Sequence, residues 1–150
     1  MKKNEQDEEI LEYINAIRLI SKATFDEGAT QMDGLIIKPC WLERILERGK
    51  RIEVRGHQTK KIGEKIYLIE SKGKVVATAV ISKVIKFDEQ SWENTKSLHQ
   101  VEITYSSLKL RYKTPYGWCL EDVEPIEPFD YVKHQGAVIW VKDVEKVENA

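Results

Sequence analysis

The chain has 150 residues, of which 41% are hydrophobic and 33% are charged, and its 24 lysines and arginines nearly balance 25 aspartates and glutamates. This length and composition predict one folded domain with a single core and exclude a disordered chain. No apolar run approaches the ~20 residues that cross a bilayer, and the opening MKKNEQDEEI lacks the apolar region of a secretory signal. We therefore expect a cytoplasmic protein with no membrane partner.

The net charge of −1 conceals an uneven distribution along the chain. Counted by segment, residues 1–33 carry −4, residues 44–65 carry +5, residues 66–115 carry +3 and residues 116–150 carry −5. The near-neutral total argues against a strongly basic nucleic-acid-binding protein, but a basic middle between acidic ends is typical of a chain with a local anionic partner. The same pattern is also that of an ordinary solvated face, and both interpretations stay open.

The first predicted element is an amphipathic helix over residues 7–22, with three acidic residues in its first turn, where the helix dipole favours them. Its hydrophobic residues recur on one stripe at helical spacing: Ile10, Leu11, Ile14 and Ile17. A turn-rich loop follows, so residues 1–33 are predicted to form a helical extension. This helix is a candidate surface for a protein partner, which would make the chain an interaction module.

A pattern of short strands begins at Leu35. The run LIIK predicts a strand, and Pro39 suits the first turn of a short helix, PCWLERILER, which ends before Gly49. The next run, RIEVRG, alternates strictly. Its two aliphatic residues therefore lie on one face of a strand, and Glu53 and Arg55 lie on the other.

The remaining elements are mostly predicted strands. IYLIE, an SKGK turn and the long run VVATAVISKVIKF form a hairpin, and YGWCLEDVEPIE and AVIWVKDVE are further strands. DEQSWENTKSLHQ is either a helix or an insertion loop, and VEITYSSLKLRYK shows β-type alternation. The predicted fold class is mainly β with α (α+β), a small mixed barrel of roughly five to seven short strands with one early helix.

The common enzyme motifs are absent: the sequence contains no phosphate loop, GxGxxG, GxSxG or HExxH. Cys40 and Cys119 are too few for a disulfide framework, which fits a reducing compartment. A metal site built from them and from His57, His99 and His134 has no support in their spacing. We therefore expect neither a metal nor a cofactor.

The stretch from Lys38 to Arg55 carries the strongest functional signal. Glu53 and Arg55 lie about 7 Å apart on one strand face, close enough to pair or to bind one ligand, and Lys50 precedes them. If that face meets solvent, they form an ordinary surface ion pair. If it lines a cavity, their burial is costly and indicates binding or catalysis.

This stretch resembles the ASCH domain, a family grouped with the PUA-like β-barrels of RNA-modifying proteins. Lys50, Glu53 and Arg55 match the family signature GxKxxExR, although Arg48 takes the place of its glycine and Gly49 follows one residue later. GHQT with the basic loop after it, and YGWCLEDVEPIEP, also resemble the family.

The resemblance implies that residues 34–143 form the ASCH domain and that residues 144–150 are a tail. It implies a cleft floored by the signature strand and bordered by the first helix. RNA, a nucleotide or a modified nucleoside suits such a cleft, because cations hold phosphate, rings stack on the base and a carboxylate reads its amino edge. The candidate binding residues are Lys38, Trp41, Lys50, Glu53, Arg55, Lys60, Lys61, Tyr116, Trp118 and Glu121.

The tryptophans have an alternative interpretation as core residues. We expect Trp41 and Trp140 in the core, whereas Trp118 is balanced between core and cleft. Trp92 lies in the least defined segment.

The resemblance also implies two possible hydrolytic activities. Some small bacterial members are amidohydrolases that deacylate acetylated cytidine with the signature Lys, the Thr after it and a later Glu, for which Glu89 and Glu93 are candidates. Here Arg51 takes the Thr position, and a guanidinium cannot form an acyl-enzyme. The other activity is a ribonuclease in which Lys50 and Glu53 are the catalytic acid/base pair. We expect binding rather than catalysis.

Overall fold

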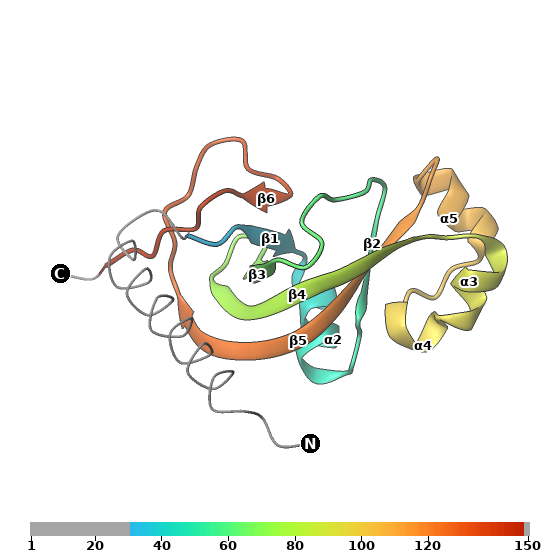
Figure 1. Ribbon diagram of the computed structural model, residues 1–150, viewed down its shortest axis with the longest axis horizontal. Helices are drawn as coiled ribbons and strands as arrows, with labels where there is room; N and C mark the ends of the chain where they lie inside the picture. The colour runs from blue at the N-terminus through green and yellow to red at the C-terminus, as the bar shows by residue number, and fades with distance from the viewer. Residues whose placement is uncertain (1–30, 149–150) are drawn as a thin grey trace, which may run out of the picture. The chain divides into compact units, whose positions relative to one another are not determined.

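The computed structural model describes residues 31–148 (Figure 1). The helix predicted over residues 7–22, and with it the predicted protein-binding surface, lies outside these residues.

A six-stranded, strongly curled sheet forms the body of the domain (Figure 1). Its strands are β1 (Gly34–Ile37), β2 (Ile52–Arg55), β3 (Lys65–Glu70), β4 (Val75–Lys86), β5 (Tyr116–Phe129) and β6 (Trp140–Val141), in the order β2-β5-β4-β3-β1-β6. Only β1 and β3 pair in parallel. The register of β4 against β5 shifts at three places, and such bulges bend a strand pair. The α+β, barrel-like fold predicted from the sequence is confirmed.

Four helices lie in the described part of the chain: α2 (Pro39–Glu47), α3 (Glu89–Asn94), α4 (Lys96–His99) and α5 (Tyr105–Arg111). Helix α2 begins at the proline as predicted. Of the two alternatives for DEQSWENTKSLHQ, the helix is the right one, because the side chains of Asp88 and Ser91 form a reciprocal capping box at the start of α3.

One strand prediction is wrong, and another is confirmed for only part of its length. VEITYSSLKLRYK holds helix α5 instead of a strand, because the Thr104 side chain caps the helix by accepting from the Ser107 N–H, and Leu108 turns into the core. AVIWVKDVE contributes only the two residues of β6, because Asp143 adopts a left-handed φ of 51° that ends the extended backbone.

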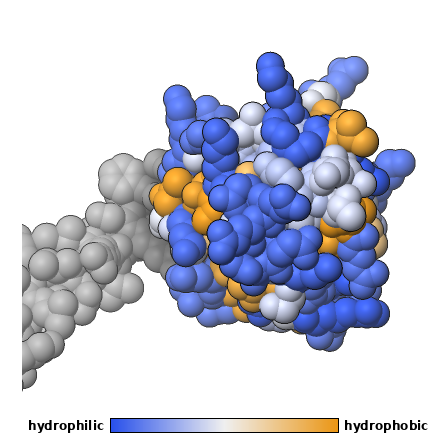
Figure 2. Space-filling view, turned by 90° about the vertical axis from the view of Figure 1, so that its right-hand side faces the viewer, coloured by the Kyte–Doolittle hydropathy of each residue, from blue (hydrophilic) through white to orange (hydrophobic). Residues whose placement is uncertain are grey.

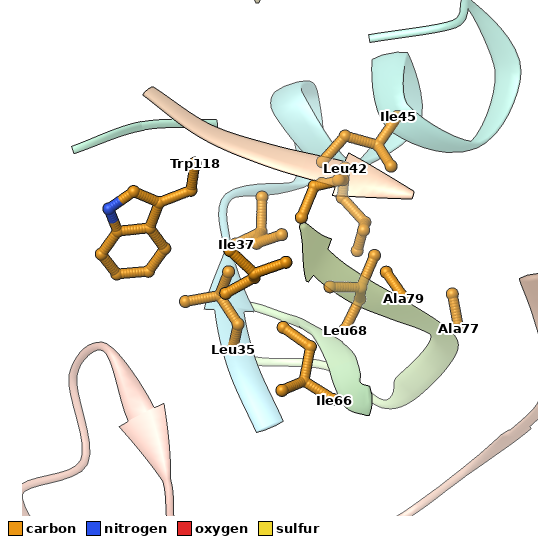
Figure 3. Close-up of a cluster of buried hydrophobic side chains, with 11 residues drawn as sticks. Leu35, Ile37, Leu42, Ile45, Ile66, Leu68, Ala77, Ala79 and Trp118 are labelled. Atoms are coloured by element: carbon orange, nitrogen blue, oxygen red, sulfur yellow. The ribbon is translucent and has the colours of Figure 1, made fainter. Parts of the chain in front are cut away.

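The main core lies between α2 and strands β1, β3, β4 and β5 (Figure 3). Its buried residues are Leu35, Ile37, Leu42, Ile45, Ile66, Leu68, Ala77, Ala79, Ile81, Trp118 and Leu120. Figure 3 shows the indole of Trp118 at one edge of this cluster. β1 and α2, on the two sides of Pro39, both bury residues in this core. This fixes the start of the stretch from Lys38 to Arg55, which we call the signature stretch.

A separate core cluster holds the helical insertion, α3 to α5, against β2. It consists of Ile52, Phe87, Trp92 and Leu108. Trp92 and Trp118 are therefore the buried tryptophans. The expectation that Trp41 and Trp140 lie in the core is wrong, because both are only half-buried at the margin of the main cluster.

The face of the molecule that carries α3 to α5 is mostly hydrophilic, with small scattered hydrophobic groups (Figure 2). No helix among residues 31–148 combines the length and apolarity needed to cross a membrane.

Candidate functional site

A cleft of about 370 Å³ lies between the signature stretch and the helical insertion. Three groups of residues line it: Lys38, Trp41, Lys50, Glu53, Val54 and Arg55 from the signature stretch; Val101, Ile103, Leu108, Arg111 and Tyr112 from the insertion; and Ile36, Ser71, Val138 and Ile139 from the sheet and its loops. Five of the predicted binding residues therefore meet in one cleft. The face of β2 that carries Glu53 and Arg55 lines a cavity instead of meeting open solvent.

The end of helix α2 positions Lys50. Gly49 adopts a left-handed φ of 73°, which turns the chain so that the Lys50 N–H donates to the Arg44 carbonyl at 3.0 Å. The glycine that matters for this turn is therefore Gly49, one residue after the place it has in the family signature. The Lys50 side chain then extends beneath Trp41, with Nζ 4.8 Å from the ring centroid.

The Lys50 ammonium is buried, with only 1% of the residue exposed. Its Nζ donates to the His99 carbonyl and lies 4.0 Å from Glu53 Oε1. Burial lowers the pKa of Lys50 to about 8, against the opposing effect of Glu53 and with the added repulsion of Arg44 and Arg55. Lys50 is thus a cation at neutral pH that loses its charge in mildly basic solution.

Glu53 bridges the two cations of the cleft. Its Oε2 accepts from Arg55 Nη2 at 2.7 Å and from Nε at 3.2 Å, while Oε1 faces Lys50. Arg55 also donates to the Ile36 carbonyl at 3.0 Å, and its guanidinium lies 5.6 Å from the centroid of the Trp118 ring. Both ends of the bridge are therefore held in one orientation before any ligand binds.

His99 is a structural residue beneath this cluster. Its Nδ1 accepts from the Val101 N–H at 3.0 Å, so Nε2 carries the proton and donates to the Trp92 carbonyl at 2.8 Å. The imidazole stacks on the Trp92 ring at 3.7 Å, and burial lowers its pKa. His99 is therefore neutral, and its carbonyl is the acceptor that the insertion offers to Lys50.

The insertion supplies a wall of the cleft that the sequence did not predict. Tyr112 packs against Gly56, where an added Cβ would lie 2.7 Å from Tyr112 Cδ1. Besides the bond from Lys50 to the His99 carbonyl, two hydrogen bonds to backbone carbonyls join this wall to the signature stretch: the Arg51 N–H donates to the Leu98 carbonyl at 2.9 Å, and Gln100 Nε2 donates to the Arg48 carbonyl at 2.7 Å. The helix caps at Asp88 and Thr104 are the sequence signals that identify this wall.

Five predicted residues do not line the cleft. Trp118 is buried beneath Arg55, donating from Nε1 to the His57 carbonyl at 2.9 Å, and Tyr116 accepts from Gln58 Nε2 at 3.4 Å. Glu121 is exposed next to a register shift of β5, and Lys60 is exposed in its loop.

Lys61 is also absent from the cleft, because it pairs with Asp33 and lies 5.2 Å from the Trp140 ring centroid. Burial raises the pKa of Asp33, but hydrogen bonds from Lys61 and the Asp143 N–H outweigh burial and lower it below its ordinary value. The charge of Lys61 is thus neutralised within the domain.

The residues of the amidohydrolase pattern are not assembled. Arg51 donates from Nη1 to the Ile45 and Lys50 carbonyls, each at 2.8 Å, so it holds the end of α2 instead of entering the cleft. Glu89 and Glu93 are exposed on α3, and Glu93 pairs with Lys96 at 3.6 Å. Within residues 31–148, no cluster of three or more His, Cys, Asp or Glu is placed to hold a metal ion.

The ASCH domain family model matches residues 35–132, so the chain belongs to the ASCH domain family. Its fold is similar to the crystal structure of ASCH from Zymomonas mobilis, with a TM-score of 0.54 and 14% identity over 67% of this chain and 73% of that one. A mutant of the same protein gives a TM-score of 0.52 and 13% identity over 67% and 76% of the two chains. No curated protein matches the sequence.

Proposed function

We propose that the cleft binds one nucleotide unit of RNA or a modified nucleoside. The observation that carries this proposal is the buried Lys50–Glu53–Arg55 bridge, which opens into a cleft with two aromatic rings, Trp41 and Tyr112. A volume of about 370 Å³ falls in the range of small-molecule sites. Two cations, Lys50 and Arg55, share the single carboxylate of Glu53, so the bridge has a net positive charge. Burying this charge is costly unless an anionic ligand pairs with it.

Arg55 is the phosphate-binding group in this proposal. Its Nε and Nη2 are held by Glu53 and by the Ile36 carbonyl. Within residues 31–148 the Nη1 atom of Arg55 has no protein partner, so the two N–H groups on Nη1 are available to a phosphate oxygen. Lys50 adds its charge from behind, and the ring of Trp41 or Tyr112 offers a face for a base.

Calorimetric titration with the four ribonucleoside monophosphates, their nucleosides and acetylated cytidine tests the proposal. Replacing Arg55→Gln should weaken binding of the preferred monophosphate by about tenfold or more, because a charge-assisted hydrogen bond is lost. Arg48→Gln is the matched control, since Arg48 is exposed and pairs with Glu43 outside the cleft. Failure of every ligand to bind the parent protein, or equal loss in both variants, would contradict the proposal.

A second candidate, hydrolysis of a modified nucleoside or RNA, is favoured by one observation. Lys50 has its pKa lowered to about 8 and faces Glu53 at 4.0 Å inside the cleft, which is typical of a catalytic amine. This activity predicts turnover of acetylated cytidine or of single-stranded RNA that is abolished in Lys50→Ala while circular dichroism shows a retained fold. Turnover that survives Lys50→Ala would exclude Lys50 as a catalytic residue.

A further inference from the structure

We propose that the ligand is a single-stranded RNA that continues from the cleft into a second groove, so that the protein binds several consecutive nucleotides instead of one isolated nucleotide. This inference rests on the proposed function and extends it. The second groove is the hollow of about 380 Å³ whose charged and aromatic residues are Lys72, Tyr131, Lys133 and His134.

The second groove adjoins the cleft. Ile36, Ser71 and Val138 line both hollows. Ile36 also holds Arg55 through its carbonyl at 3.0 Å, so the phosphate-binding group of the cleft lies at this junction. Val138 is 77% exposed, and an exposed aliphatic side chain between the two hollows gives a base a surface to pack against. A chain leaving Arg55 past Val138 therefore enters the second groove directly.

The charge of the second groove suits a phosphodiester chain. Lys72 and Lys133 are both exposed in its wall, and in the described part of the chain no carboxylate lines it. Lys133 lies 5.9 Å from the ring centroid of Tyr131, which is buried in the core, and the exposed His134 is the ring at the surface of the groove. Cations combined with an exposed ring in one groove are a usual means of binding single-stranded nucleic acid without a fixed sequence.

This path differs from the one expected from the sequence. The sequence favoured Lys60 and Lys61 as binding residues, but Lys61 is neutralised by Asp33 and neither residue lines the cleft or the second groove. Lys72 and Lys133 lie more than sixty residues apart in the sequence. They come together because β1 pairs with both β3 and β6, which brings the turn after β3 and the loop before β6 to the same region.

The test compares a ribonucleoside monophosphate with a single-stranded RNA of about eight nucleotides, within the usual site size for such grooves. The variant is Lys72→Asn/Lys133→Gln; asparagine is chosen because Lys72 has a left-handed φ of 63° that asparagine tolerates. Lys83→Gln/Lys86→Gln, two exposed lysines of β4 outside both hollows, is the control with the same charge change. Thermal unfolding of all three proteins verifies that each is folded.

We expect the parent to bind the RNA more tightly than the monophosphate. The Lys72→Asn/Lys133→Gln variant should lose about tenfold in RNA affinity and about 1 to 1.5 in the slope of log affinity against log salt, with monophosphate binding unchanged. The control should match the parent. Equal affinity of the parent for both ligands, an unchanged salt slope in the variant, or equal competition by an acidic peptide would each overturn the inference while leaving monophosphate binding in the cleft intact. If the parent bound neither the monophosphate nor the RNA, the proposed function itself would be overturned.

Discussion

The two walls of the cleft differ in how they are built. The signature wall comes from one continuous stretch, Lys38 to Arg55, and places charged groups at the floor of the cleft. The insertion wall comes from residues 88–112 and contributes three aliphatic side chains, the Tyr112 ring, the exposed Arg111 and the His99 carbonyl. The signature wall supplies the buried charges, and the insertion wall supplies the aliphatic surroundings and the carbonyl acceptor that hold Lys50 in place.

The walls depend on each other through Lys50. Without the insertion, the Lys50 ammonium would lose its acceptor at His99 and would meet solvent. Its pKa would then rise, because burial is the largest cause of its present low value. The chemistry of the signature residues is therefore set by a segment outside the signature.

Trp92→Ala should have the largest effect. Trp92 is fully buried, donates from Nε1 to the Ile103 carbonyl at 2.9 Å and stacks on His99, so its truncation should lower the free energy of unfolding by about 4 kcal/mol. The half-buried Trp41 of the signature wall is the comparison, and Trp41→Ala should cost less than about 2 kcal/mol. Urea denaturation measures both. Similar losses in the two variants would show that the insertion wall is not integral to the core; should Trp92→Ala fail to fold, Trp92→Leu serves in its place.

Lys50→Met should change how stability depends on pH. The folded-state pKa of about 8 lies below the value of 10.5 for an unburied lysine, so between these values the unfolded state binds more protons and the free energy of unfolding rises with pH. Relative to Lys50→Met, the parent should therefore gain on the order of 3 kcal/mol across this window. Urea denaturation at several pH values measures the difference.

The control for this pH effect is Lys83→Met, which removes an exposed lysine instead of a buried one. Its difference in stability from the parent should stay constant over the same pH window. A constant difference for Lys50→Met as well would mean that Lys50 is solvated in solution, and the role assigned to the insertion wall would be wrong.

The sequence predicted the signature wall well because its information is local. Proline at the start of α2, glycine at its end and strict alternation in β2 act over a few residues each, so the positions of Lys50, Glu53 and Arg55 follow from short-range rules. The β3–β4 hairpin was predicted for the same reason.

The insertion wall was not predicted because tertiary contacts decide its conformation. Val101 and Ile103 alternate with polar residues as in a strand, yet both pack against the Trp92 cluster in a connection between helices. Glu121 was misplaced because the register of β5 shifts close to it, and one shift moves a side chain to the other face. Lys61 was misplaced because its partner, Asp33, is distant in sequence.

Gly56→Ala should give the smallest change in stability, and it still distinguishes the contributions of the two walls to ligand binding. The new Cβ would lie 2.7 Å from the Tyr112 ring, and a half-buried ring at the cleft can move away, so the free energy of unfolding should change by about 1 kcal/mol or less. Displacing the ring should weaken binding of the preferred monophosphate several-fold, as calorimetric titration would measure. In a Tyr112→Leu background the same substitution should have no further effect, because the affinity effects of two residues acting through one contact are not additive. An undiminished effect in that background would assign the loss to the signature strand, and the insertion wall would then support Lys50 without contacting the ligand.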